Sequence, residues 1–132
     1  MRCPLPLILL LVLAAGGASS VSCAEGPAPA AADVFTARIA PILESQCLRC
    51  HGEARQKGHL KLNSRDAMLA GGSSGPAIIV GDPEHSLLIT AVRYQDRDLQ
   101  MPPDDRLTEE QIADLVRWIA AGAPWAQPES SP

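Results

Sequence analysis

Apolar residues recur at helical spacing in several segments of the chain, and no segment alternates over enough positions to build a β-sheet. The segment near the C-terminus has the clearest apolar stripe, formed by Ile112, Leu115, Val116 and Ile119. Thr108 and Gln111 form a capping box at its start, and Gly122 closes it. We expect Asp114 and Arg117 to face solvent. The pattern predicts an amphipathic last helix.

An earlier helix should carry the apolar side chains of Phe35, Ile39, Ile42 and Leu43. Asp33 is its expected N-cap. Pro41 lies inside the pattern and should end or kink the helix near Ala40, because proline lacks the N–H that a helix interior uses. We expect the helix to resume through Ser45 and lead into Cys47.

Two shorter helices are predicted between these. One runs over 65–70, is capped by Asn63 or Ser64, and stops at the glycines that begin loop 71–76. The other starts at Asp82-Pro83 and ends near Tyr94. Loop 71–76 is rich in glycine, but no Gly-Lys-Ser/Thr follows it, which argues against a phosphate-binding loop. The predicted fold class is all-α, in one domain.

The N-terminal segment predicts export. Residues 1–24 combine Arg2, a short apolar run and small residues, as in a secretory signal peptide. A flexible Ala/Pro-rich spacer (25–32), the folded domain (33–126) and a disordered tail (127–132) are expected to follow. We expect a periplasmic protein, tethered to a membrane only if Cys23 is a lipidated cysteine. Plain cleavage is favoured over lipidation.

Composition narrows the possible partners. The chain has 11 Lys and Arg against 15 Asp and Glu, a formal net charge of −4. There is no basic stripe, so we expect no nucleic-acid partner. A mildly acidic surface favours redox partners with basic patches, mainly through the encounter rate.

Cys47, Cys50 and His51 form the pattern C-x-x-C-H, the attachment signature of a c-type haem. Two thiols three residues apart lie on one side of a helical turn, where each can form a thioether with one haem vinyl group. The histidine that follows can then bind the iron as proximal ligand. A structural zinc site would need further ligands, and no second cysteine pair exists to supply them. A redox dithiol would be expected in a βαβ unit, which is absent here.

An electron-transfer haem needs a second axial ligand. The candidates are Met68, Met101, His59 and His85. Met101 is favoured, because it lies in a proline-stiffened loop before the last helix and a thioether raises the reduction potential. Met68 fits a helix core better, while the two histidines lie in polar surroundings and stay open as alternatives.

With these residues in place, the sequence from about Phe35 to Trp125 resembles the cytochrome c domain family common in planctomycetes and related bacteria. The motifs that carry the resemblance lie at 39–43, 47–52, 57–62, 71–77, 81–88, 101–103 and 118–125. The resemblance implies a class I-like cytochrome c fold, with terminal helices packed near one haem edge. It also implies thioethers at Cys47 and Cys50, and axial ligation by His51 and Met101.

Two features depart from the family. His59 stands where the family usually has glycine, which adds a possible competing ligand. The family also often heads long multidomain proteins, whereas this sequence stops soon after Trp125. This difference leaves open whether the domain works alone or beside separately encoded partners.

The sequence thus predicts an exported monohaem cytochrome with one covalent haem c, which carries single electrons between redox proteins. We see no nucleophile, base constellation or substrate pocket, so we expect neither an enzyme nor a small-molecule substrate. The alternative is a haem-based ligand sensor or peroxidase-like protein with a displaceable sixth ligand. Carbon monoxide binding to the ferrous protein would separate the two.

Overall fold

The computed structural model describes residues 30–126. The predicted signal peptide, residues 25–29 of the predicted spacer and the tail therefore lie outside the described residues. The spacer was predicted to reach residue 32, but helix α1 already begins at Ala31, so that boundary is wrong. Between 30 and 126 the regular structure is helical, with two isolated bridges and no strand, which confirms the all-α prediction. Within this range, no helix has both the length and the apolar character needed to cross a bilayer.

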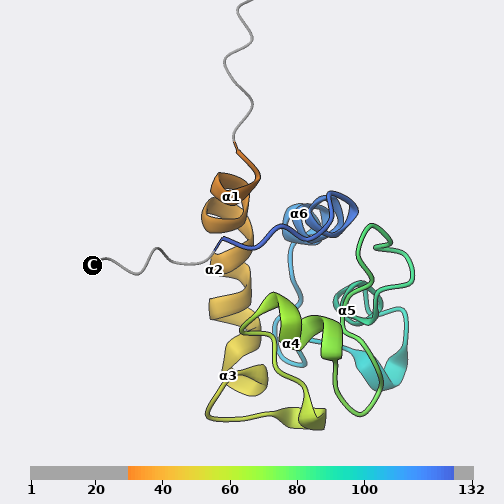
Figure 1. Ribbon diagram of the computed structural model, residues 1–132. Helices are drawn as coiled ribbons and strands as arrows, with labels where there is room; N and C mark the ends of the chain where they lie inside the picture. Colours follow the sequence, from red (N-terminus) through yellow and green to blue (C-terminus); the bar gives the residue numbers. More distant parts are fainter. Residues whose placement is uncertain (1–29, 127–132) are drawn as a thin grey trace, which may run out of the picture.

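The N-terminal part of the domain is one continuous helical rod (Figure 1). Its successive segments are α1 (Ala31–Val34), the π-helical η1 (Phe35–Ile39), α2 (Ala40–Ile42), the π-helical η2 (Leu43–Cys47) and α3 (Leu48–His51). The N-cap is Ala30, so the prediction that Asp33 caps this helix is wrong, and Asp33 lies in the first turn instead.

The rod does not end at Pro41, which was one of the two outcomes predicted there, and it continues through Ser45 to Cys47 as expected. Directly before the proline, the N–H of Ala40 donates to the carbonyl of Phe35, five residues back. This wider π turn relieves the clash that a proline ring makes with a regular helix backbone. The hydroxyl of Ser45 also donates to the Pro41 carbonyl at 2.7 Å. The proline is thus accommodated by a local change of helix type.

The two short helices differ in how well they were predicted. Helix α4 (Arg65–Ala70) begins at Ser64, whose side chain accepts a hydrogen bond from the Ala67 N–H at 3.1 Å, and ends at Gly71. Both boundaries were expected. Helix α5 (Leu87–Val92) starts four residues later than Pro83, so the prediction of its start is wrong.

Ser86 explains the late start of α5. It is fully buried, and its hydroxyl accepts from the Ile79 N–H and donates to the Asp82 carbonyl, both at 2.8 Å. The Asp82 carboxylate accepts from the His85 N–H. The segment before α5 is therefore a closed turn held by Ser86, and the acid at its start caps that turn rather than a helix.

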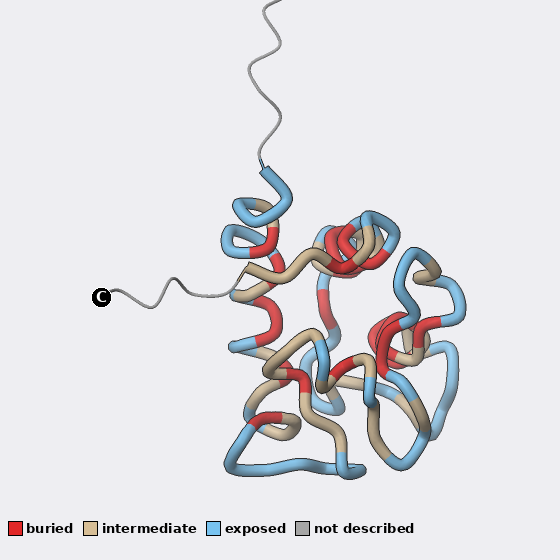
Figure 2. Tube along the Cα trace, in the orientation of Figure 1, coloured by how far each residue is buried: buried red, intermediate tan, exposed pale blue. Residues whose placement is uncertain are grey.

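Helix α6 (Glu109–Ala120) begins with the predicted Thr108–Gln111 capping box and ends in a Schellman motif at Gly122. It packs against η1 and α5. Figure 2 shows buried positions where these elements face one another. At one end, Phe35 packs on Trp125 with ring centroids 4.4 Å apart and the rings tilted by 43°, and it also packs on Trp118. This aromatic cluster joins the two ends of the domain.

Asp114 does not face solvent as expected: only 10% of its side chain is exposed. It accepts hydrogen bonds from Arg117 of the same helix at 2.5 Å and from Arg38 of η1 at 3.2 Å. Desolvation raises the pKa of Asp114. The hydrogen bonds and charges of the two arginines lower it by more, so the net pKa lies below the ordinary value. The helical pattern places Asp114 beside the apolar stripe, where the arginines cover it.

We predict that Asp114→Asn destabilises the domain by about 1 kcal/mol at neutral pH, because two charge-assisted hydrogen bonds are lost. The pKa of Asp114 is lowered on folding, so its contribution is present above the ordinary value of 3.8 and disappears as pH falls through the lower folded value. Urea unfolding should therefore separate the variant from the wild type at neutral pH but not in strong acid. Glu110→Gln, which alters an exposed carboxylate 3.5 Å from Arg38, is the control and should have little effect.

Candidate haem-binding cavity

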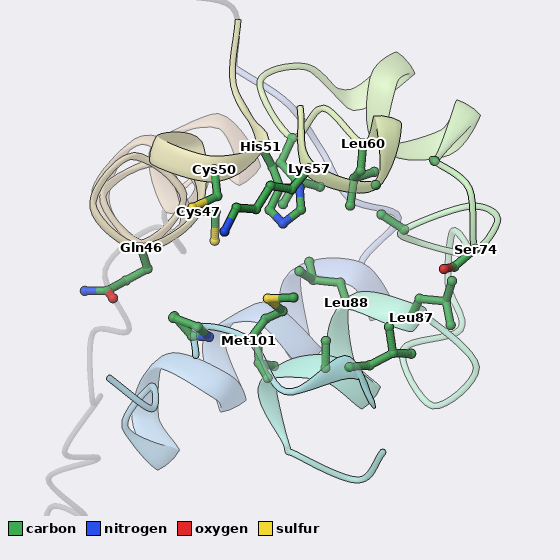
Figure 3. Close-up of a pocket in the computed structure, with 18 of the residues that line it drawn as sticks. Gln46, Cys47, Cys50, His51, Lys57, Leu60, Ser74, Leu87, Leu88 and Met101 are labelled. Atoms are coloured by element: carbon green, nitrogen blue, oxygen red, sulfur yellow. The ribbon is translucent and has the colours of Figure 1, made fainter. Parts of the chain in front are cut away.

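A cavity of about 350 Å³ lies between the end of the rod and the segment that joins α5 to α6. This volume is within the range of sites that hold small molecules and cofactors. Its walls are largely apolar, with side chains that include Leu60, Leu62, Ala77, Leu87, Leu88, Ala91, Val92 and Leu99. Figure 3 shows the cavity with the candidate haem residues on its walls.

The C-x-x-C-H motif spans the end of η2 and all of α3. One helical turn places Cys47 and Cys50 on the same side, and both line the cavity. They form no disulfide. Cys47 is buried, and burial raises the pKa of its thiol to about 11. The helix ends at Gly52, where a Cβ would lie only 2.5 Å from the Leu48 carbonyl oxygen.

His51 lines the same cavity. Its Nδ1 atom is buried and has no hydrogen-bond partner, although buried polar atoms are nearly always paired. The His51 backbone is fixed by its carbonyl, which accepts from the Leu62 N–H at 2.7 Å. The donor set of one imidazole and two thiols, on the wall of a largely apolar cavity, fits a covalently attached haem.

Met101 faces His51 across the cavity (Figure 3). It follows η4 (Arg97–Leu99), and its N–H donates to the Ala91 carbonyl of α5 at 3.2 Å. The next carbonyl, that of Pro102, accepts from the Tyr94 hydroxyl. The guanidinium of Arg106 covers the Tyr94 ring at 5.3 Å. The Met101 loop is thus held to α5 and to the residues that follow it.

The other candidate ligands lie elsewhere. Met68 is fully buried in the core, as expected of a packing residue. His59 is exposed in η3 (Lys57–His59), and His85 is exposed and bound to the Asp82 carboxylate at 2.7 Å, which lowers the pKa of Asp82. Of the four candidates, Met101 alone lines the cavity. Residues 30–126 contain no group of three or more His, Cys, Asp or Glu side chains that could hold a metal ion.

Sequence reasoning missed several residues that shape this cavity. Ser73, Ser74 and Lys57 line it, and Tyr94 holds the loop that carries Met101. The glycines of loop 71–76 could have pointed to the two serines, because they indicate an unusual backbone that holds the residues between them in place. Tyr94 carried no comparable signal, because its contact depends on how the loop folds back.

The family model described as Planctomycete cytochrome C matches residues 47–105. Residues 47–105 are therefore similar to a planctomycete-type cytochrome c domain. The matched segment holds every cavity-lining residue except Gln46, whereas α6 and most of the rod lie outside it. Cytochrome c domains bind haem and generally transfer electrons. The search of curated proteins gave no match, and neither did the search of solved structures.

If the cavity holds a haem, we predict that Gly52→Ala lowers the yield of covalently bound haem. The added Cβ would meet the Leu48 carbonyl between the two cysteines, and relieving such an overlap costs about 1–3 kcal/mol. The haem content per purified protein, read from its absorption, measures the effect. Ala37→Ser is the control, because it alters an exposed side chain of η1 that does not line the cavity. Equal yields in the two variants would show that this turn tolerates a side chain.

Proposed function

We propose that this chain is an exported monohaem c-type cytochrome that carries single electrons between redox proteins. The observation that carries the proposal is the placement of Cys47, Cys50 and His51 on one wall of an apolar cavity, with Met101 on the facing wall. The same segment matches a cytochrome c family.

Each of the four residues has a distinct role in this proposal. The thiols of Cys47 and Cys50 would hold the haem through two thioethers, and His51 and Met101 would bind its iron. When bound, the haem supplies a one-electron Fe(III)/Fe(II) couple. If both His51 and Met101 bind the iron, no position would be left for a substrate, and a thioether ligand would favour the ferrous state.

The remaining cavity residues control access. Leu88, Ala91 and Val92 of α5 are buried behind Met101 and exclude water from that wall. On the other wall, Cys50 is half-buried and Arg49 is exposed, so this edge faces solvent. A redox partner would approach here. We propose a periplasmic location from the predicted signal peptide, with membrane attachment only if Cys23 is lipidated.

The first experiment compares the absorption spectra of the wild type and Met101→Ala, both matured in a periplasm with haem-attachment machinery. The wild type should contain covalent low-spin haem with an Fe(III)–thioether band, and the variant should lose the band and bind carbon monoxide readily when reduced. Met68→Leu is the matched control, because it replaces a methionine that is fully buried away from the cavity. Its band should persist.

Other spectra would revise the proposal in defined ways. A low-spin spectrum that is indifferent to Met101→Ala would move the sixth ligand to a histidine, such as His59 or His85. A high-spin wild type would favour a ligand-binding sensor or peroxidase-like protein. A colourless wild type would exclude the haem proposal.

We also predict that Tyr94→Phe loosens the Met101 loop without removing the haem. The variant loses the hydrogen bond to the Pro102 carbonyl, worth about 1 kcal/mol, which corresponds to roughly a fivefold larger population with Met101 displaced. In a urea titration, the Fe(III)–thioether band should disappear before global unfolding, and earlier than in the wild type. If band loss and unfolding coincide in both proteins, Tyr94 does not hold the loop.

A further inference from the structure

One end of the cavity is polar. Ser73 and Ser74 line it, and both side chains are exposed enough for their hydroxyls to turn toward a ligand. Figure 3 shows the Ser74 hydroxyl directed into the cavity, at the end away from Cys47 and Cys50. This end contrasts with the leucines and alanines of the facing wall.

The backbone holds these serines in place. Gly72 and Gly75 exchange two hydrogen bonds of 3.0 Å across the turn, and the Ser73 N–H donates to the Gly58 carbonyl at 2.8 Å. A Cβ at Gly72 would lie 2.4 Å from that same carbonyl oxygen, and one at Gly71 would lie 2.0 Å from the Gly75 oxygen. Glycine is therefore required where the turn docks on η3. The glycines serve to present the two serines rather than to leave the loop free.

The charges around the cavity favour an anion. Its lining residues include Arg49 and Lys57 but no aspartate or glutamate. Arg49 lies 3.9 Å from Asp104. In the turn Gly72–Gly75, which we call the serine turn, the backbone N–H groups donate to carbonyls of the fold. The exception is Ser74, whose N–H makes none of the described backbone hydrogen bonds. Two hydroxyls and one N–H are thus available as donors.

We propose that the turn Gly72–Gly75 binds the propionate carboxylates of the haem through the hydroxyls of Ser73 and Ser74. The inference rests on the proposed function, because it requires the haem. In haem, the two vinyl groups and the two propionates lie on opposite edges of the ring. Attachment at Cys47 and Cys50 therefore directs the propionates to the end of the cavity where these serines lie.

The test compares the wild type with the double variant Ser73→Ala/Ser74→Ala as purified holoproteins. Without the hydroxyl donors, the negative charge of the propionates is less compensated, which favours Fe(III). The Fe(II)/Fe(III) ratio at the wild-type midpoint potential should fall about threefold, a decrease of about 28 mV at 59 mV per tenfold change. The propionate bending band in the resonance Raman spectrum should also shift.

Two further variants sharpen the test. Ser73→Thr/Ser74→Thr keeps both hydroxyls and should restore the potential and the Raman band. Thr36→Ala is the control, because it removes an exposed hydroxyl from η1, outside the cavity, that donates to the Ala32 carbonyl. It should change neither readout. All variants should retain covalent haem and the Fe(III)–thioether band, which shows that they fold.

An unchanged potential and Raman band in the double alanine variant would overturn the proposal. A shift of the band in Lys57→Gln, with none in the alanine variant, would assign the carboxylates to Lys57 instead and overturn it as well. Failure of the proposed function gives a different result, since the wild type would then carry no covalent haem at all.

Discussion

Ile39 of η1 and Leu115 and Ile119 of α6 are fully shielded from solvent where these two helices pack together. Burying each side chain contributes about 1.5–3 kcal/mol, and the arginine-covered Asp114 extends the same contact. The geometry of the cavity depends on this packing. The rod runs on from η1 to the cysteines and His51, while the Met101 loop leads into α6. Fixing one helix against the other therefore fixes the separation of the two walls.

Within this frame, the cavity is built from one stretch of the chain. All of its lining residues lie between Gln46 and Pro103, and the family match covers nearly the same range. Both cavity walls are stabilised by short-range contacts: the Leu62 N–H on the His51 carbonyl, and the Ala91 carbonyl on the Met101 N–H. The terminal helices supply the rigid packing, and the intervening loops supply the chemistry.

The sequence predicted best what depends on local chemistry. The Ser64 cap of α4, the capping box of α6 and the C-x-x-C-H motif each involve residues within a few positions of one another. Prediction from the sequence failed where the local structure depends on distant groups or on an unusual backbone conformation. The π turn before Pro41 has no residue signature, and the burial of Asp114 depends on Arg38 from another helix.

The start of helix α5 shows the same limit, because there a local sequence signal was outweighed by a contact of the folded chain. Asp82-Pro83 is a good helix start in isolation, but the buried Ser86 uses its hydroxyl to close a turn there. Of the candidate site, the sequence pointed to Cys47, Cys50, His51 and Met101, and all four line the cavity, while their roles toward a haem stay predictions. The contacts of Tyr94 and of the serine turn could not be predicted. Each is made to a backbone carbonyl that only the folded loops bring near.

The contact between Phe35 and Trp125 has a consequence for how such a domain can be combined with others. It joins a residue near each end of the described chain at the part of the rod that contains η1, whereas the cavity lies beside α3 at the rod's other end (Figure 1). Neither Ala30 nor Ala126, the first and last described residues, lines the cavity. Under the proposed function, a connection made at either of these residues would therefore start away from the proposed haem edge at Arg49.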